Sequence, residues 1–446
     1  MPLFTVSIVR YEEPLKSVRK AVDLCRGLDH LPAKARVFIK PNIVFWTRFV
    51  PFPKWGVITT SRVVEDVVIL LKERGIDDIT IGEGTVTSRP KDFETPAHAF
   101  ETLGYPTLQK RYGVKFLNVF ERPFKKRDLG DGAALHFNAD FLESDFLINL
   151  PVLKTHAQAV VSLGIKNLKG LIDIPSRKKC HNASPGRDLN FYVSRLARSI
   201  PPSLTVVDGI YSNERGPGFD GRIHRSNILI ASSDVLSTDM VGAKVLGYEP
   251  SQVPHLAQAA REKGRPVDLS DMEVVGQEPA EVALHHEYTF PYNQEGTLPL
   301  PMATLGIRGL SYKKYDLTMC TYCSGLTRII LMAIARAWKG QPWDEVEILT
   351  GKAMKPTPGM KKTILMGQCM VQANKDNPDI REMIPVKGCP PSRKELIKAL
   401  RQAGIEVDPS FIEHLELAPG AYMKRYQGKP EFDEAFFTVS QPGPSR

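Results

Sequence analysis

The sequence has no long apolar run and no recognisable export signal. None of its stretches approaches the roughly 18 uninterrupted apolar residues that a membrane-spanning helix needs, so membrane insertion is not expected. The N-terminal segment MPLFTVSIVRYEEPL is typical of a β-strand, and it lacks the basic start, apolar middle and small-residue cleavage site of a signal peptide. On these grounds we expect a cytoplasmic protein.

The sequence also lacks the glycine-rich motifs that bind nucleotide phosphates. No Walker loop is present, and the G-x-G at Gly82–Gly84 has no third glycine and opens on no clear helix. These absences argue against a P-loop enzyme and against a dinucleotide fold. A flavin site stays open, because many flavin sites leave no short motif.

Positive charge is in excess but is not concentrated. The formal charge is +9, and Lys and Arg are spread along the chain in small clusters such as Arg177-Lys178-Lys179. A nucleic-acid binder would gather them on one face or in a tail, with aromatic residues between them. A basic pocket for a small anion and a solvated basic surface explain the excess as well, so nucleic acid is the less favoured partner.

The chain does contain an alternation of short apolar strands and amphipathic helices. Its 446 residues suffice for two or three domains, and a content of 42% hydrophobic and 24% charged residues is typical of a globular protein. Strands are predicted at 4–11, 35–44, 77–84, 145–153, 203–210 and 227–234, and helices at 14–28, 61–75 and 237–247. This order predicts an α/β fold with a mostly parallel sheet flanked by helices, whose active site lies at the carboxyl ends of the strands.

The strand–helix rhythm weakens between residues 277 and 318. We therefore expect an α/β domain over 1–276, a connecting segment over 277–318, and a smaller C-terminal α+β domain over 319–446. Helices are predicted in this last domain at 326–340 and 392–404. The terminal segment SQPGPSR is expected to be disordered.

Four of the six cysteines lie in the last third of the chain, whereas Cys25 and Cys180 stand alone. The four begin with a Cys-x-x-Cys pair and are Cys320, Cys323, Cys369 and Cys389. A disulfide framework is not expected in a reducing cytoplasm. Four such thiolates can complete a tetrahedral zinc site or a [4Fe–4S] cluster, and four buried, unligated cysteines are the remaining alternative.

Two features favour a [4Fe–4S] cluster over Zn²⁺. Structural zinc sites usually combine two Cys-x-x-Cys knuckles, whereas 19 residues separate Cys369 from Cys389. Two prolines follow Cys389, and proline directly after a cluster cysteine recurs in ferredoxins. The segment VKGCPPSRKELIKAL also resembles the cluster-binding end of hydrogenase small subunits and of the matching subunit of respiratory NADH dehydrogenase, in which the cysteine of GCPP is a ligand.

Several segments of the first 265 residues together resemble a known family. They are IKPNIV, ITIGEGT, DFLINLPVLKTHAQAVVSLGIKNLKGLI, VVDGIYSNERGPGFDG and ILIASSDVLSTDMVGAKVLG. They resemble the large prokaryotic family catalogued as domain of unknown function three-six-two, many members of which carry iron–sulfur motifs. The resemblance implies the α/β fold and supports an iron–sulfur protein of anaerobic metabolism. This sequence departs from the family pattern at Glu214-Arg215, where a glutamate–glycine pair is usual. The stretch LPVLKTH also resembles the lactate racemase family, in which histidines move protons or hydride beside an organic cofactor.

Polar side chains that turns do not require follow the predicted strands. Ammonium and backbone N–H groups bind carboxylates and phosphates, so we expect a basic cleft for a small anionic substrate. The predicted substrate-binding residues are Lys40, Asn42, Glu83, Lys166, Asn167, Lys169 and Glu214. The predicted catalytic residues are His156, as a general acid or base, with Lys154, His181 and Asp208. We expect His181 to face the same cleft, and Asp208 and Glu214 to orient a histidine or bind a cation.

Three functions follow from these features. The first is an iron–sulfur oxidoreductase that acts on a small anionic substrate and uses a redox partner such as a ferredoxin. The second is a non-redox lyase, isomerase or transferase that uses His156, with a structural cluster or zinc ion. The third is an electron-transfer or RNA-binding protein, and a homo-oligomer is left open in each case.

Overall fold

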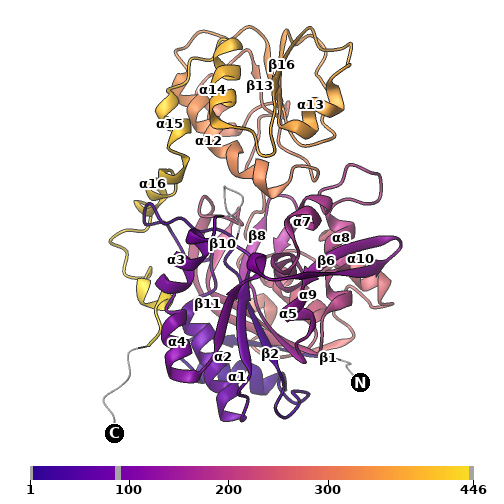
Figure 1. Cartoon of the computed structure of the whole chain (residues 1–446), viewed down its shortest axis with the longest axis vertical. Coiled ribbons are helices and arrows are strands. Elements are labelled where there is room, and N and C mark those ends of the chain that lie inside the picture. Colours follow the sequence, from indigo (N-terminus) through magenta and orange to yellow (C-terminus); the bar gives the residue numbers. More distant parts are fainter. Residues whose placement is uncertain (1–3, 86–91, 441–446) are drawn as a thin grey trace. The chain divides into compact units, whose positions relative to one another are not determined.

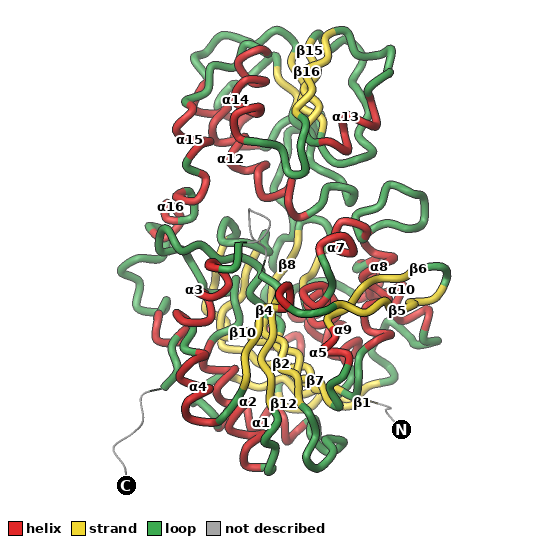
Figure 2. Tube along the Cα trace, in the orientation of Figure 1, coloured by secondary structure: helices red, strands yellow, loops and turns green. Residues whose placement is uncertain are grey.

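The computed structural model describes residues 4–85 and 92–440 and divides the chain into two compact units (Figures 1 and 2). Unit 1 comprises Met1–Ser176, Asn190–Tyr288 and Pro419–Arg446, and unit 2 comprises Arg177–Leu189 and Thr289–Ala418. The division differs from the expected domains, because a short segment of the first half joins the cysteine-bearing unit and the end of the chain returns to unit 1. Of the terminal segment expected to be disordered, all but Ser440 lies outside the described residues.

Unit 1 is built on a large sheet with helices on both faces. The strands of the sheet are β1 (Phe4–Arg10), β2 (Val37–Pro41), β3 (Ile79–Glu83), β4 (Lys115–Asn118), β7 (Phe146–Leu150), β8 (Val152–His156), β9 (Val160–Ser162), β10 (Ser203–Glu214), β11 (Arg222–Ser232) and β12 (Met272–Gly276). A separate hairpin is formed by β5 (Phe124–Gly130) and β6 (Ala133–Asn138). The helices of unit 1 are α1 (Lys16–Leu24), α2 (Ser61–Glu73), α3 (Glu94–Thr102), α4 (Tyr105–Tyr112), α5 (Ala139–Leu142), α6 (Gly164–Asn167), α9 (Val235–Val245), α10 (Pro254–Glu262) and α16 (Gly420–Met423). Helices α7 (Ile174–Lys179) and α8 (Leu189–Arg195) lie at the two points where the chain passes between the units.

The large sheet is mostly parallel, as predicted. Its order is β12-β1-β11-β10-β7-β2-β3-β4, and β8 pairs with β10 and carries β9. The pairs β1·β12, β10·β7, β10·β8, β2·β7, β2·β3 and β3·β4 are parallel. Strand β11 runs antiparallel to both β1 and β10. The α/β fold class is therefore confirmed, and the reversed strand β11 is the feature that the sequence pattern did not predict.

Alternate residues of the central strands pack against opposite helix layers, because successive side chains of a strand point to opposite faces. Val37 and Ile39 of β2 belong to a core cluster with α1 and α2. Phe38 lies between them in the sequence and contacts Phe141 of α5, with 5.8 Å between the ring centroids. Helices α1 and α2 therefore cover one face of the sheet, and α5 covers the other (Figure 1).

Helix α2 begins at Ser61, as predicted, and Thr60 caps it, because the Thr60 hydroxyl accepts a hydrogen bond from the backbone N–H of Val63 at 3.4 Å. The strand predicted at 145–153 is two strands, β7 and β8. Pro151 stands between them and has no N–H to donate to a strand ladder.

Unit 2 has its own parallel sheet. Its strands pair in the order β13 (Leu310–Ser311), β14 (Val346–Leu349), β15 (Lys362–Met366) and β16 (Glu382–Val386). Its helices are α11 (Leu300–Thr304), α12 (Thr321–Ala337), α13 (Gln368–Asn374), α14 (Arg393–Gln402) and α15 (Pro409–Glu413). The smaller separate domain is thus present as predicted, but its strands alternate with helices along the chain. The carboxyl ends of its parallel strands consequently share one edge.

The residues between β12 and Tyr288 form no further strand or α-helix but belong to unit 1. The stretch after η5 (Pro279–Val282) is tied to helix α9 by two hydrogen bonds, from Leu284 N to the Val245 carbonyl at 2.7 Å and from His286 N to the Leu246 carbonyl at 3.0 Å. The expected connecting segment 277–318 is therefore divided between the units at Tyr288. Among the residues described, no helix combines the length and the apolar character needed to cross a membrane.

Candidate functional site

Five polar residues predicted at strand ends form one hydrogen-bond network in unit 1. Lys40 Nζ lies 2.7 Å from Glu83 Oε2, and neither side chain is more than 3% exposed. Lys40 Nζ and Asn42 Nδ2 both donate to Asn167 Oδ1, at 3.3 and 2.8 Å. Lys154 Nζ donates to Asn42 Oδ1 at 2.6 Å. The network joins the ends of β2, β3 and β8 to α6, on the edge where ligands bind in such sheets.

The turn that follows α6 packs against the buried part of this network, whereas Asn42 is half-buried. Lys40 and Lys154 are both fully buried. A Cβ atom on Gly170 would lie 2.5 Å from Glu83 Oε1 and 2.6 Å from Lys40 Cε, so glycine is needed for the turn to approach this closely. The two lysines were expected to line an open basic cleft. In the structure their ammonium groups are instead directed at protein atoms.

Burial changes the acid–base behaviour of Lys154. Loss of solvation lowers the pKa of Lys154 to about 7, an effect that the charge of Glu83 opposes and the charge of Lys40 reinforces. Lys154 Nζ also donates to the Val57 carbonyl at 2.8 Å. The amine therefore exchanges a proton near neutral pH, which is the property required of a general acid or base.

His156 ends β8 and is oriented by backbone amides. Its Nδ1 accepts from the N–H groups of Gln158 at 3.1 Å and Ala159 at 3.3 Å. In the neutral imidazole the proton consequently resides on Nε2. The ring is 8% exposed. The predicted acid–base histidine thus has a fixed tautomer.

Two backbone amides of the GIKNLKG segment are occupied by a carboxyl group of the chain itself, whose pKa burial raises to about 8. The carboxylate of Asp239 on α9 accepts from Gly164 N at 2.6 Å and from Ile165 N at 2.8 Å. These two amides were among the backbone groups predicted to hold a substrate anion. Asp239 instead anchors the start of α6 and thereby places Asn167 in the network.

The remaining predicted residues of unit 1 lie around this region in different roles. Asp208 Oδ2 accepts from Thr60 N at 2.7 Å, and burial raises the pKa of the Asp208 carboxyl. This position supports the start of α2 and not a histidine. Lys166 is half-buried, and its charge acts on the fully buried His255. Lys169 is buried in the turn Leu168–Leu171.

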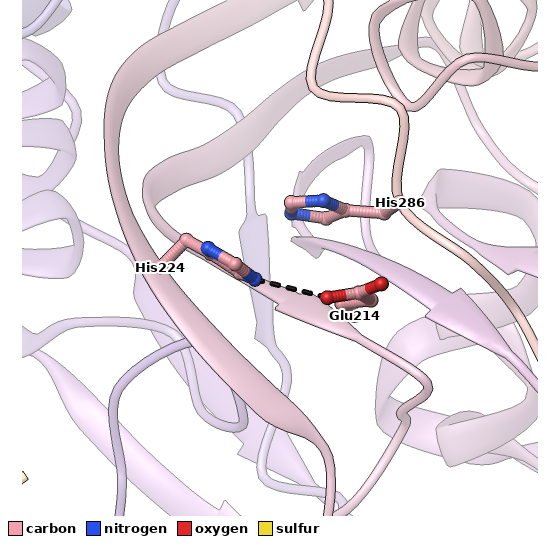
Figure 3. Close-up of side chains that lie close together, drawn as sticks. All are labelled: Glu214, His224 and His286. Carbon is pink, nitrogen blue, oxygen red and sulfur yellow. Dashed lines mark hydrogen bonds and ion pairs between the residues drawn. The ribbon is translucent and has the colours of Figure 1, made fainter. Parts of the chain in front are cut away.

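Glu214 lies beside two histidines that the sequence did not single out (Figure 3). Its Oε2 is 3.2 Å from His224 Nε2, and the rings of His224 and His286 are 4.6 Å apart between centroids. The ligand atoms of the three side chains all lie within 4.8 Å of one another. The expectation that Glu214 orients a histidine is met by His224.

The four C-terminal cysteines gather at the carboxyl edge of the unit 2 sheet. Cys320 is the N-cap of α12 and Cys323 lies in its first turn, Cys369 begins α13 after β15, and Cys389 follows β16. The thiol of Cys323 donates to Cys320, which raises the pKa of Cys323 and lowers that of Cys320. The charges of Cys369 and Cys389 also act on Cys323. All four sulfur atoms therefore lie within electrostatic reach of one another.

Two lysines of unit 2, Lys178 and Lys352, lie near these cysteines, and Lys178 belongs to the segment Arg177–Leu189. Lys178 Nζ donates to Cys389 Sγ at 3.2 Å. Lys352 Nζ donates to the carbonyls of Lys178 and His181. His181 was predicted to share a cleft with His156, but it belongs to unit 2, where its Nδ1 lies 2.9 Å from the Leu317 carbonyl oxygen.

The spacing of the cysteines differs from that of a bare zinc site. A tetrahedral zinc ion with Zn–S bonds of about 2.3 Å brings its sulfurs to roughly 3.8 Å from one another. In the described parts of the chain, the set of three or more potential ligands within 4.8 Å is Glu214, His224 and His286, and no three of the cysteines are that close, although Cys320 and Cys323 share a hydrogen bond.

Sequence reasoning missed several residues that the structure places at these sites. They are Asn149, which accepts from Asn167 Nδ2, and Asp239, His224, His286 and Lys352. Asn149 and Asp239 lie inside the motifs DFLINLPVL and STDMVGAKVLG, so the motifs themselves were the available signal. His286 lies in a segment with no regular pattern and gave no signal.

Two known proteins each match about half of the chain. A thylakoid-associated protein of Synechocystis sp. is 29% identical over 252 residues, which cover 55% of this chain and 74% of that protein. The lactate racemase apoprotein of Thermoanaerobacterium thermosaccharolyticum has a TM-score of 0.34 and 15% identity, over 55% of this chain and 57% of that one. This chain thus spans little more than half of the racemase, and a likeness at this level says nothing of activity.

The family described as Domain of unknown function (DUF362) matches residues 37–244. The matched region contains the buried network, His156, Glu214 and His224, whereas the four C-terminal cysteines lie outside it. The match to this family's model agrees with the family resemblance of the sequence motifs, and residues 37–244 of this chain are similar to the DUF362 family.

Proposed function

We propose that the protein is an iron–sulfur redox protein, in which Cys320, Cys323, Cys369 and Cys389 of unit 2 hold one [4Fe–4S] cluster. The observation that carries the proposal is the gathering of these four residues, which are up to 69 positions apart in the sequence, at one edge of a parallel sheet. Of the four, Cys320 alone is buried and Cys389 is exposed, so packing into an apolar core does not account for their convergence. The family match does not reach these four cysteines, so the proposal rests on the geometry of unit 2 itself.

The surroundings of the four thiols fit a cluster better than a zinc ion. No three of the four sulfur atoms lie within 4.8 Å of one another, and a spacing wider than that of a bare zinc site leaves space for a core of iron and sulfide. Four thiolates bring negative charge to the site, and Lys178 at 3.2 Å from Cys389 Sγ offsets part of it. Bound there, the cluster would supply one-electron transfer.

We assign the binding of a small anionic substrate to unit 1. Together with a cluster in unit 2, this would make the protein an oxidoreductase, which we place in the cytoplasm with a redox partner such as a ferredoxin. Support comes from the position of His156, Lys154 and Lys166 near the carboxyl ends of parallel strands. His156 would exchange a proton at Nε2, since Nδ1 is occupied by backbone amides. The buried Lys40 and Lys154 would contribute positive potential and hold the surrounding loops in place.

The decisive experiment is a metal count on the full chain purified without oxygen. We expect about four iron and four sulfide per chain with a broad absorption band near 400 nm. Serine replacement of each of the four cysteines should remove most of the iron. Cys25→Ser is the matched control, because Cys25 is a buried cysteine of unit 1 and its loss should leave the iron content unchanged. About one zinc and no sulfide per chain would contradict the proposal.

A second candidate function is a non-redox acid–base enzyme, which the fixed tautomer of His156 favours. Small carboxylates and phosphates should then raise the melting temperature of the full chain, and His156→Ala should abolish this effect while iron or zinc content stays constant. A shift of equal size in the variant would exclude His156 from the binding site.

A further inference from the structure

The long hairpin of β10 and β11 brings polar side chains to one of its faces. In the antiparallel register Ser212 is directly opposite His224, and Glu214 lies two residues beyond Ser212. Because side chains two residues apart point to the same face, Ser212, Glu214 and His224 share one face of the hairpin. His286 reaches the same face from the segment after η5, as Figure 3 shows.

The distances within this group match those between the ligands of one small metal ion. Glu214 Oε2 and His224 Nε2 are 3.2 Å apart. Ligands at about 2.0–2.1 Å from a tetrahedral zinc ion stand roughly 3.3 Å from each other. The nearest ligand atoms of Glu214, His224 and His286 all lie within 4.8 Å, so a small inward shift is enough to place them around one ion.

The three side chains are held in orientations suited to ligation. The His286 ring has a hydrogen bond with the Leu284 backbone, and its Nε2 lies 2.7 Å from Ser212 Oγ. Metal-bound histidines commonly donate their other N–H to a backbone carbonyl in this way. Glu214 Oε1 accepts from Glu287 N at 3.4 Å, which turns Oε2 toward His224.

The backbone around His286 is equally fixed. Its N–H donates to the Leu246 carbonyl at 3.0 Å, and its own carbonyl accepts from the Tyr248 hydroxyl at 2.6 Å. Both partners lie at the end of α9, so the imidazole is carried by a rigid support. The site is thus assembled from three parts of unit 1.

We propose that Glu214, His224 and His286 bind one divalent metal ion of the zinc class, separate from the cysteines of unit 2. Two imidazoles and one carboxylate are a donor set for Zn²⁺ and related first-row ions, and three protein ligands leave a position for water or an oxygen ligand. The His224 side chain is 33% exposed and that of Glu214 is 13% exposed, so solvent reaches the ion. This proposal does not depend on the cluster.

The test is Zn²⁺ binding to the full chain, purified without oxygen and titrated against a competing chelator. We expect wild type to bind one more equivalent than Glu214→Gln or His224→Ala, with affinity reduced at least about 100-fold in each variant. His30→Ala is the control, because His30 is exposed and its loss should change nothing. Iron content should be the same in all four proteins, which separates this result from the fate of the cluster.

A second probe distinguishes these ligands from thiolates. Co²⁺ bound by nitrogen and oxygen lacks the intense sulfur-to-metal absorption that cysteine ligation produces, so the wild-type signal should be of the weak kind and should vanish in His224→Ala. Circular dichroism establishes that each variant is folded. Folded variants that bind Zn²⁺ as tightly as wild type, or a Co²⁺ signal of thiolate type alone, would overturn the proposal.

Discussion

Separating Lys40 from Glu83 should destabilise unit 1 far more than breaking a comparable ion pair on its surface. The two charges are 2.7 Å apart with exposed fractions of 0% and 3%. In Lys40→Met the carboxylate keeps hydrogen bonds from Ile43 N and Gly84 N but loses its counter-charge. Removing one partner of a buried pair costs about 3–5 kcal/mol, so each single variant, Lys40→Met or Glu83→Gln, should lose about that much.

The double variant should lose much less than the sum of the two. With both charges gone no uncompensated charge stays buried, and we expect a coupling free energy of about 2–3 kcal/mol from the double-mutant cycle. Lys115 and Asp78 are the matched surface pair, at 2.9 Å and with side chains 67% and 43% exposed. Their coupling should be at most about 1 kcal/mol and should vanish in high salt, whereas the buried coupling should persist.

The assay is denaturant unfolding followed by tryptophan fluorescence. Trp46 and Trp55 report on unit 1, and Trp338 and Trp343 are replaced by phenylalanine in every protein so that unit 2 stays silent. Single variants that each cost less than about 1 kcal/mol, or a strictly additive double variant, would refute the view that this network depends on a buried ion pair.

Three further outcomes are expected. Burial lowers the pKa of Lys154 to about 7 in the folded protein, whereas in the unfolded chain the pKa is about 10.5. Between these pH values the unfolded chain binds one more proton than the folded one. The free energy of unfolding of unit 1 should therefore rise with pH by up to about 1.4 kcal/mol per pH unit, relative to Lys154→Met. Parallel pH profiles of the two proteins in denaturant titrations would contradict the lowered pKa. Gly170→Ala should destabilise by about 1–3 kcal/mol, because its Cβ would lie within 2.6 Å of Lys40 and Glu83. Gly325→Ala on α12 meets no atom within 4 Å and should stabilise by up to about 1 kcal/mol, so thermal unfolding must give opposite signs. If unit 2 holds a cluster, Lys178→Met should lower the reduction potential of the cluster relative to Lys178→Arg, because a positively charged hydrogen-bond donor to Cys389 Sγ is lost. A spectroelectrochemical titration measures both potentials. Equal potentials would show that Lys178 does not influence the cluster.

The fold was largely predictable because its signals are local and periodic. Helix α2 was predicted at 61–75 and spans Ser61–Glu73, and the predicted strand at 77–84 is β3 at Ile79–Glu83. The reversed direction of β11 was not predictable, because an apolar strand looks the same whether its neighbours run with it or against it. The transfer of Arg177–Leu189 to unit 2 likewise depends on long-range contacts such as that of Lys178 with Cys389.

The part of the candidate site that lies at the ends of parallel strands was predictable from the sequence. Lys40, Asn42, Glu83, Lys154 and Asn167 come together because the carboxyl ends of parallel strands share one edge. Their burial was not predictable, since it depends on how closely the turn at Gly170 approaches. His224 and His286 were missed because a hairpin register and an irregular segment bring them to Glu214, and neither leaves a pattern in the sequence.

The path of the chain between the two units limits how the protein can be divided. Unit 2 consists of a short segment that ends at Leu189 and a long one that ends at Ala418. The last residues of the chain return to unit 1, where Trp55 donates a hydrogen bond to the Asp433 carbonyl and Ser440 donates to Glu65. During synthesis, therefore, neither unit has all its parts until the ribosome has passed residue 418. A fragment cut at Tyr288 would lose the segment that covers Trp55, and one beginning at Thr289 would lack Lys178 and His181. The two units therefore cannot be expressed as two continuous fragments, because each fragment would lack a segment that lies elsewhere in the sequence.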